Sequence, residues 1–485
     1  KIIVVDKTTM ERVPLEKFIE DMDHSKHETL RQSVLTATCN FNHRVKMFYK
    51  HIVMGKNNRM CVQFYSYRIE FQDRGAAHVH GVLWVDWKAF CSNLENQKDF
   101  GDKLKYLEMA FKTLKDDSKI LSENEYKALA IFADIFTTCS LDSDVIKQKL
   151  YRLSDSDKDG NVIEDLLKLK ESAAKKVANT VCECNRHHHT KSCRKYDTSC
   201  RYNIPFFPSK ETLIAVPSSK LSKYAEIDDD FSKFKNADTA TMKNLLSHYQ
   251  KILTNVKQIL SDIVPEFEKQ EYGTYEHQNL TEAVDKLLNE ANTNWDEYRT
   301  ALKISFSGGY KLVLKRHVKE ILINSYNPNW SLAWEANLDL QICLDYHAVI
   351  TYIADYYSKD DTGTLQYLRE AAKQFGRESL REKLNIMKNV FLTHRQMGEA
   401  EAIYRLLPNL HLKESNLATK FVPSGFPENR SKFLLKINED KEYLAFGRET
   451  VTIEGREDRY VEKPSIVSKY ERRDVKNHPE LDTLS

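Results

Sequence analysis

Residues 70–84 read Glu-Phe-Gln-Asp-Arg-Gly-Ala-Ala-His-Val-His-Gly-Val-Leu-Trp, and the rest of the chain is organised around this stretch. The residues before it, 62–69, and those after its turn, 81–85, are rich in β-branched and aromatic side chains. The turn itself is polar and contains one glycine. This pattern predicts two antiparallel strands joined by a turn, which is a β-hairpin.

The predicted hairpin gathers candidate metal ligands on one face. Residues two apart in a strand project to the same side, so His78 and His80 lie together, and Glu70 and Gln72 lie together on the facing strand. Two imidazoles with one or two side-chain oxygens suit Mg²⁺, Mn²⁺ or Zn²⁺ with open coordination positions. A histidine pair at this spacing also occurs on polar strand faces without a function, so the hairpin alone leaves both interpretations open.

The composition limits the class of protein. A chain of 485 residues has room for about three domain-sized units, and 41% hydrophobic residues are sufficient for a core. Its 14 glycines and 11 prolines favour a helix-rich protein. Because 73 Lys and Arg residues face 71 Asp and Glu residues, any nucleic-acid surface must be local. No apolar run is long enough for a transmembrane helix, and no secretory signal opens the chain, which we expect to be part of something longer.

A second cluster of candidate ligands lies in residues 181–208. The nine cysteines are an odd number and four of them cluster with histidines, which indicates a reducing compartment and a metal site. Seven Cys and His residues fall within 19 positions, a density that predicts four-coordinate zinc in a short loop. Free cysteines in a histidine-rich surface turn are the alternative.

A pair of tyrosines gives a third candidate. Tyr352 and Tyr356 are four residues apart on a predicted helix, so their hydroxyls emerge on one face, and Lys359 follows within a turn. A tyrosine hydroxyl is a weak nucleophile near neutral pH and becomes useful when a metal polarises the phosphate it attacks. An aromatic core stripe is the alternative.

The remaining segments read mostly as helices. An amphipathic helix is expected over 35–54, and helical segments over 88–180 and 218–303, where one run should end at Pro265. Residues 334–344 alternate like a half-buried strand. After about residue 415 the chain is charged and weakly patterned.

Three blocks, about 35–85, 181–215 and 308–410, resemble Helitron-type rolling-circle transposases in their HUH (histidine, hydrophobe, histidine) Rep nuclease domain. The first block carries EFQ-x-RG-x-x-HVH-x-x-LW, which is similar to the HUH motif. The second is similar to the family's CN-x-H-x-H-T-x-x-C … CRF-x-FP element, through Cys184, His187, His189, Cys193 and Cys200. The third resembles the family's two-tyrosine region through Asn324, Tyr326, Asn327, Pro328, Ala333, Trp334, Ala336, Asn337, Asp339, Gln341, Leu344, Asp345, Ala348, Tyr352, Tyr356 and Lys359.

The resemblance implies an α+β fold. Its ferredoxin-like HUH core, an antiparallel sheet with flanking helices, would carry large helical insertions and a small zinc element. The predicted divisions are the first part of the core with the hairpin, a helical insertion, the zinc element, a second helical insertion, the second part of the core with the tyrosine helix, and a charged tail or linker. In the same order they span 1–88, 89–180, 181–215, 216–303, 304–410 and 411–485.

The resemblance also implies an activity, which is metal-dependent nicking and joining of single-stranded DNA at transposon ends and target through a 5′-phosphotyrosine bond. His78, His80 and an oxygen from Gln72 or Glu70 would hold Mg²⁺ or Mn²⁺. Tyr352 or Tyr356 would attack the phosphate, and Lys359 would stabilise charge or bind DNA.

The family further implies structural zinc on four of Cys184, His187, His189, Cys193 and Cys200, and a nuclear location in a eukaryote. Such transposases continue into a helicase, so a helicase domain is expected downstream. The sequence itself contains no G-x-x-x-x-G-K-[ST] phosphate loop. Two alternatives remain: a viral or plasmid-type replication initiator with the same chemistry, and a catalytically silent, transposon-derived DNA-binding protein.

Overall fold

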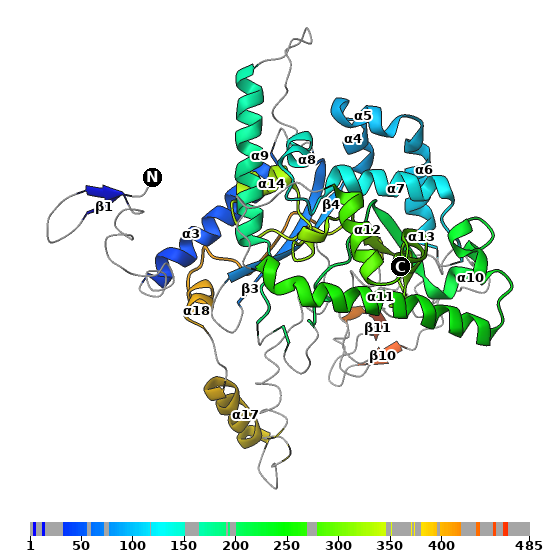
Figure 1. Ribbon diagram of the computed structural model, residues 1–485. Helices are drawn as coiled ribbons and strands as arrows, with labels where there is room; N and C mark the ends of the chain where they lie inside the picture. Colours follow the sequence, from blue (N-terminus) through cyan, green and yellow to red (C-terminus); the bar gives the residue numbers. More distant parts are fainter. Residues whose placement is uncertain are drawn as a thin grey trace. The chain divides into compact units, whose positions relative to one another are not determined.

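The computed structural model of the chain divides into two compact units, residues 1–415 and 416–485 (Figure 1). The structure describes residues 3–5, 12–14, 33–55, 60–71, 77–116, 118–150, 164–190, 193–194, 200–268, 279–345, 351, 370, 373, 380–394, 398–418, 433–436, 450–452 and 459–463.

The predicted hairpin is present in the first unit. Strands β3 (Val62–Phe71) and β4 (Ala77–Val85) pair antiparallel, with one register irregularity near the start of β3. A third short strand, β8 (Lys413–Ser415), pairs antiparallel with the free edge of β3, so the order is β4-β3-β8. The prediction of an antiparallel hairpin is therefore confirmed, whereas the third strand was not predicted from the sequence.

The two faces of this sheet differ in polarity because side chains alternate along each strand. Tyr67 and Ile69 point to the buried face and are 1% and 2% exposed. Arg68 lies opposite His80, and Glu70 lies opposite His78, on the other face. The buried face packs against helices, whereas the charged and imidazole side chains of the polar face are only partly buried.

The helix predicted over 35–54 covers the buried face. It forms α3 (Val34–Met47), continues into a π-helical segment η1 (Phe48–Val53), and packs with α18 (Glu399–Leu406). A small apolar core joins these helices to the sheet; its buried members are Val45, Tyr67, Ile69 and Tyr404.

A second small sheet organises the larger core of the first unit. Strand β5 (Leu213–Pro217) is buried along its whole length and lies between β6 (Ile304–Ser305), which is parallel to it, and β7 (Lys311–Val313), which is antiparallel. Helices from both expected helical segments surround this core. They include α7 (Glu123–Phe136), whose capping box is formed by Ser122 and Glu125, and α11 (Thr239–Glu268).

The other elements of the first unit are β1 (Ile3–Val5), β2 (Arg12–Pro14), α4 (Trp87–Ser92), α5 (Leu94–Phe100), η2 (Gly101–Lys103), α6 (Leu104–Thr113), α8 (Ser143–Gln148), α9 (Glu164–Cys184), η3 (Ser218–Lys220), α10 (Leu221–Tyr224), η4 (Asp229–Phe234), α12 (Leu280–Glu290), α13 (Trp295–Leu302), η6 (Val318–Glu320), α14 (Pro328–Trp334) and α17 (Leu380–His394). Of the described helices, none is both long enough and apolar enough to cross a membrane.

Two predictions of secondary structure are wrong, one about the end of a helix and one about a strand. Helix α11 does not end at Pro265 but continues to Glu268, because a proline in the last turns removes only one of the helix hydrogen bonds while Val264 stays buried in the core. Residues 334–344 do not form a strand. Leu338, in the middle of this segment, pairs with a side chain instead: Asn185 donates from Nδ2 to its carbonyl and accepts from its N–H at Oδ1.

The second unit, residues 416–485, lies within the segment 411–485 that was expected to be a charged tail or linker. Its described residues form three short antiparallel strands, β9 (Phe433–Lys436), β10 (Thr450–Thr452) and β11 (Arg459–Lys463), in the order β10-β11-β9. These strands were not predicted from the sequence, because each is only three to five residues long and the segment is highly charged with little periodicity.

The chain is therefore an α+β protein with small sheets and many helices. A three-stranded antiparallel sheet with helices on one face is present among the described residues. The finer expectation of a ferredoxin-like core, and the predicted domain divisions, stay predictions.

Candidate metal sites

The hairpin brings together three of the residues predicted to bind Mg²⁺ or Mn²⁺. The Nε2 atom of His80 lies 3.1 Å from Oε2 of Glu70, and His78 lies directly opposite Glu70 on the same face. The side chains of His80 and Glu70 are 24% and 20% exposed, so they are reachable from solvent. Among the described residues, the side chains close enough together to hold a metal ion are those of the His/Cys group described below, so a cation bound by the hairpin stays a prediction.

The other residues predicted for this site lie outside the described residues. They are Gln72, Tyr352, Tyr356 and Lys359. Among the ligand candidates, Glu70 is therefore the oxygen donor that the structure brings to the histidines.

The sheet around the hairpin site is held by a group of tyrosines and one glutamate. Tyr65 and Tyr67 donate hydrogen bonds of 3.1 and 2.7 Å to the two carboxylate oxygens of Glu414 on β8. Burial and the nearby carboxylate raise the pKa of Tyr65 to about 12 and that of Tyr67 further. Glu414 could not be predicted from the sequence, because nothing in the local pattern of residues 413–415 connects it with a strand about 350 residues earlier.

The glycine that follows the histidines has a packing role. Gly81 lies opposite Tyr67, and a Cβ atom at position 81 would be only 2.9 Å from the hydroxyl oxygen of Tyr49 and 3.2 Å from Cβ of Tyr67. A side chain at position 81 would therefore require the Tyr49 hydroxyl to shift and its other neighbours to give slightly. The glycine thus lets the histidine strand pack closely on the helix behind it.

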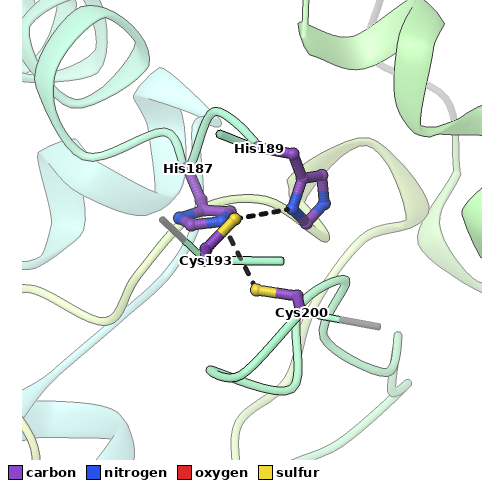
Figure 2. Close-up of side chains that lie close together, drawn as sticks. All are labelled: His187, His189, Cys193 and Cys200. Carbon is purple, nitrogen blue, oxygen red and sulfur yellow. Dashed lines mark hydrogen bonds between the residues drawn. The ribbon is translucent and has the colours of Figure 1, made fainter. Parts of the chain in front are cut away.

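The second site is formed by His187, His189, Cys193 and Cys200, whose ligand atoms all lie within 4.8 Å of one another (Figure 2). The Sγ atom of Cys193 is 3.6 Å from Nδ1 of His189, and Sγ of Cys200 is 3.5 Å from Nε2 of His187. Two thiols and two imidazoles at such distances are a ligand set for tetrahedral zinc. This group could hold a metal ion, as the sequence predicted. It consists of four of the five residues that were candidates for zinc ligands.

Cys184, the fifth candidate, does not belong to this group. It is the last residue of α9, and the ligand loop begins only after the next two residues. Asn185 is 1% exposed and fixes the exit from the helix through its bonds to Leu338. The backbone N–H of His187 then donates to the carbonyl of Leu322, 2.8 Å away, so the first ligand is tied to a distant segment.

The electrostatic setting favours metal binding. Burial and the neighbouring His189 lower the pKa of His187 to about 4, and burial also lowers the pKa of His189. Both rings are therefore neutral near pH 7, which is the form that binds metals. Cys193 is 2% exposed, and Nε2 of His189 is buried without a hydrogen-bond partner, so water reaches the interior of the site poorly.

Two residues of α11 support the ligand loop. Oε1 of Glu268 accepts a 3.0 Å hydrogen bond from the backbone N–H of His189, and Nζ of Lys257 donates a 2.7 Å hydrogen bond to the carbonyl of Asn203. Burial lowers the pKa of Lys257 to about 8. The sequence predicted only that this segment is helical. No local signal could have linked this helix to a loop that it contacts across 54 and 79 residues of sequence.

The three blocks that carry the resemblance contact one another in the first unit. The guanidinium of Arg44 lies 5.1 Å from the centre of the Trp334 ring, and Phe48 packs edge-on against Trp330 and Trp334. The zinc block joins the third block through isolated bridges, one of which pairs Arg186 with Ile323. Segments more than 280 residues apart in the sequence therefore form one assembly.

Comparisons with known proteins found no similarity: no family model, no curated protein and no solved structure matches this chain significantly.

Proposed function

We propose that this chain is a metal-dependent single-strand DNA endonuclease and strand transferase of the rolling-circle, Helitron-like type. The observation that carries the proposal is the polar face of the β3–β4 hairpin, on which His78, His80 and Glu70 gather. The contacts between the three resembling blocks support it further, because residues that act together must fold together.

Imidazole and carboxylate groups, which the hairpin carries on one face, are the ligand types that a divalent cation would bind. His78, His80 and Glu70 would hold Mg²⁺ or Mn²⁺, which supplies Lewis-acid polarisation of the scissile phosphate. Gln72, the alternative to Glu70 as the oxygen donor, follows two residues after it and would share its face in an extended strand.

The tyrosines supply the covalent step. The hydroxyl oxygen of Tyr352 or Tyr356 forms a bond to phosphorus while the bond from phosphorus to the 3′-oxygen breaks. The tyrosine loses its proton and the departing 3′-oxygen gains one. The product is a 5′-phosphotyrosine bond and a free 3′-hydroxyl, and a second tyrosine permits a second transfer without water. Lys359 would offset the charge on the phosphate.

The His/Cys site fits structural zinc in the same protein. Its ligand set is complete with four protein residues, which is typical of structural rather than catalytic zinc. Its role in the proposed enzyme is to fix the loop between α9 and β5, which carries the exposed cations Arg194 and Arg201.

The test uses a single-stranded oligonucleotide labelled at either end, incubated with the protein and Mn²⁺. We expect a covalent adduct that retains the label on the 3′ side of the nick, and no adduct with the double variant Tyr352→Phe, Tyr356→Phe. Tyr202→Phe, an exposed tyrosine beside the zinc loop, is the matched control and should form the adduct normally. Failure of the wild type to form an adduct, or an undiminished adduct in the double variant, would favour the silent DNA-binding protein instead.

A further inference from the structure

The polar face of the hairpin sheet carries more than the candidate metal ligands. Phe64 and Trp84 are opposite each other on β3 and β4, and both project from the same face as the two histidines. They are 42% and 41% exposed, which is unusual for large aromatic rings. The aromatic rings on the other face, such as Tyr67, are packed against helices.

A row of cationic and imidazole side chains crosses the same face. Lys413 on β8 and His80 on β4 lie on either side of Arg68 on β3, in direct register. Lys413 is exposed to solvent, whereas Arg68 and His80 are partly buried. Through Lys413, the short strand β8 therefore adds a second positive charge to this face, beside that of Arg68 in the hairpin.

Spacing along β3 separates the features of this face. With a rise of about 3.3 Å per residue, Phe64 is roughly 13 Å from Arg68 and roughly 20 Å from Glu70. A ligand that contacts the aromatic pair, the cationic row and the Glu70 region together must be extended, carry negative charge and present flat rings. Single-stranded nucleic acid has these three properties, and stacking on aromatic rings beside a cationic track is how proteins bind it without reading its sequence.

We propose that this face is a binding platform for single-stranded nucleic acid, in which bases stack on Phe64 and Trp84 while the phosphate backbone follows Arg68 and Lys413. One part of this proposal rests on the proposed function, namely that the bound strand is delivered to His78, His80 and Glu70. Binding itself needs no metal and no nicking, so it is tested separately.

The first experiment measures binding of a fluorescent single-stranded oligonucleotide by anisotropy in the presence of EDTA. Phe64→Ala and Trp84→Ala should each weaken binding roughly tenfold or more, because stacked bases contribute strongly to such complexes. Phe306→Ala, which removes an aromatic ring of similar exposure next to β6, is the control and should bind as the wild type does. Circular dichroism and thermal melting of each variant verify that it is folded.

The second experiment separates stacking from charge. Lys413→Ala should lower the slope of log affinity against log salt by about 0.7, the value for one phosphate contact on a single strand. Trp84→Ala should leave that slope unchanged while lowering the affinity. Lys243→Ala, which removes an exposed lysine on α11, should change neither quantity.

Three results would overturn the platform. These are unchanged binding in the double variant Phe64→Ala, Trp84→Ala, equal affinity for blunt duplex DNA, and self-association of the wild type that the same variant abolishes, which would identify an interface between copies. Loss of binding in that variant together with no covalent adduct in the wild type would support the platform and contradict the nuclease.

Discussion

The two candidate metal sites obtain their ligands in different ways. In the hairpin, His78, His80 and Glu70 come from two neighbouring strands and remain partly open to solvent. In the His/Cys site, the ligands come from one loop, which is tied down by α11 and by the segment around Leu322. The first arrangement suits an ion that acts on a substrate, and the second suits an ion that stabilises the fold. Substitutions in the hairpin site are therefore expected to lower activity, and substitutions in the His/Cys site are expected to lower stability.

The largest expected effect is loss of zinc from the closed site. Cys193→Ser should abolish binding of one equivalent of zinc and destabilise the first unit by several kcal/mol, since structural zinc sites contribute about 10–16 kcal/mol of apparent binding free energy in zinc-finger peptides. Elemental analysis after dialysis and thermal melting with and without a chelator measure both quantities.

Cys184→Ser is the matched control for this prediction. Cys184 neighbours the ligand loop but lies outside the group of four, so this variant should retain one zinc and melt near the wild-type temperature. Loss of zinc from Cys184→Ser, with retention in Cys193→Ser, would contradict the assignment of ligands.

The next effect concerns the open site. The double variant His78→Ala, His80→Ala should lower the rate of metal-dependent nicking by roughly 10³-fold, because Lewis-acid stabilisation is worth several kcal/mol. Its free energy of unfolding should fall by only about 1 kcal/mol, since the contact between His80 and Glu70 is partly exposed. Single-turnover nicking assays and urea denaturation measure the two changes. If this double variant instead lost several kcal/mol of stability, the proposed difference between the hairpin site and the His/Cys site would be wrong.

A smaller effect is expected from the support of the closed site. Glu268→Ala removes the carboxylate that accepts from the backbone N–H of His189, and zinc affinity should fall by about tenfold to a hundredfold. Competition with a chromophoric chelator measures the affinity. Glu266→Ala, at an exposed position on the same helix, should leave it unchanged.

The smallest effect concerns the sheet beneath the open site. Tyr67→Phe removes one hydrogen bond to Glu414 and should lower the free energy of unfolding near pH 7 by about 1 kcal/mol. Because the pKa of Tyr67 is raised in the folded state, the unfolded chain loses this proton first, so the contribution is complete below pH 10 and declines above it. Denaturation curves from pH 8 upwards should show that the wild type loses more stability than the variant above about pH 10. An equal loss in both proteins would contradict this role.

The parts of the molecule that the sequence predicted correctly are those set by short-range periodicity. The alternation around His78 and His80 fixed their common face, and the density of Cys and His in 182–200 predicted a group of ligands. The choice among the five zinc candidates needed the path of the chain after α9, which depends on the contact between Asn185 and Leu338. Glu414 and Glu268 reach their sites through contacts across 347 and 79 residues, and no local pattern encodes such contacts.

The pairing of β8 with β3 has a consequence for synthesis. Tyr67 and Glu414 are 347 residues apart, so at typical translation rates the ribosome needs on the order of tens of seconds to deliver the strand that covers the second edge of β3. During this interval the edge is available for pairing with other nascent chains, as unprotected strand edges are. The yield of folded protein should therefore depend on how fast translation proceeds from β3 to β8, and on chaperones that shield the hairpin in the meantime.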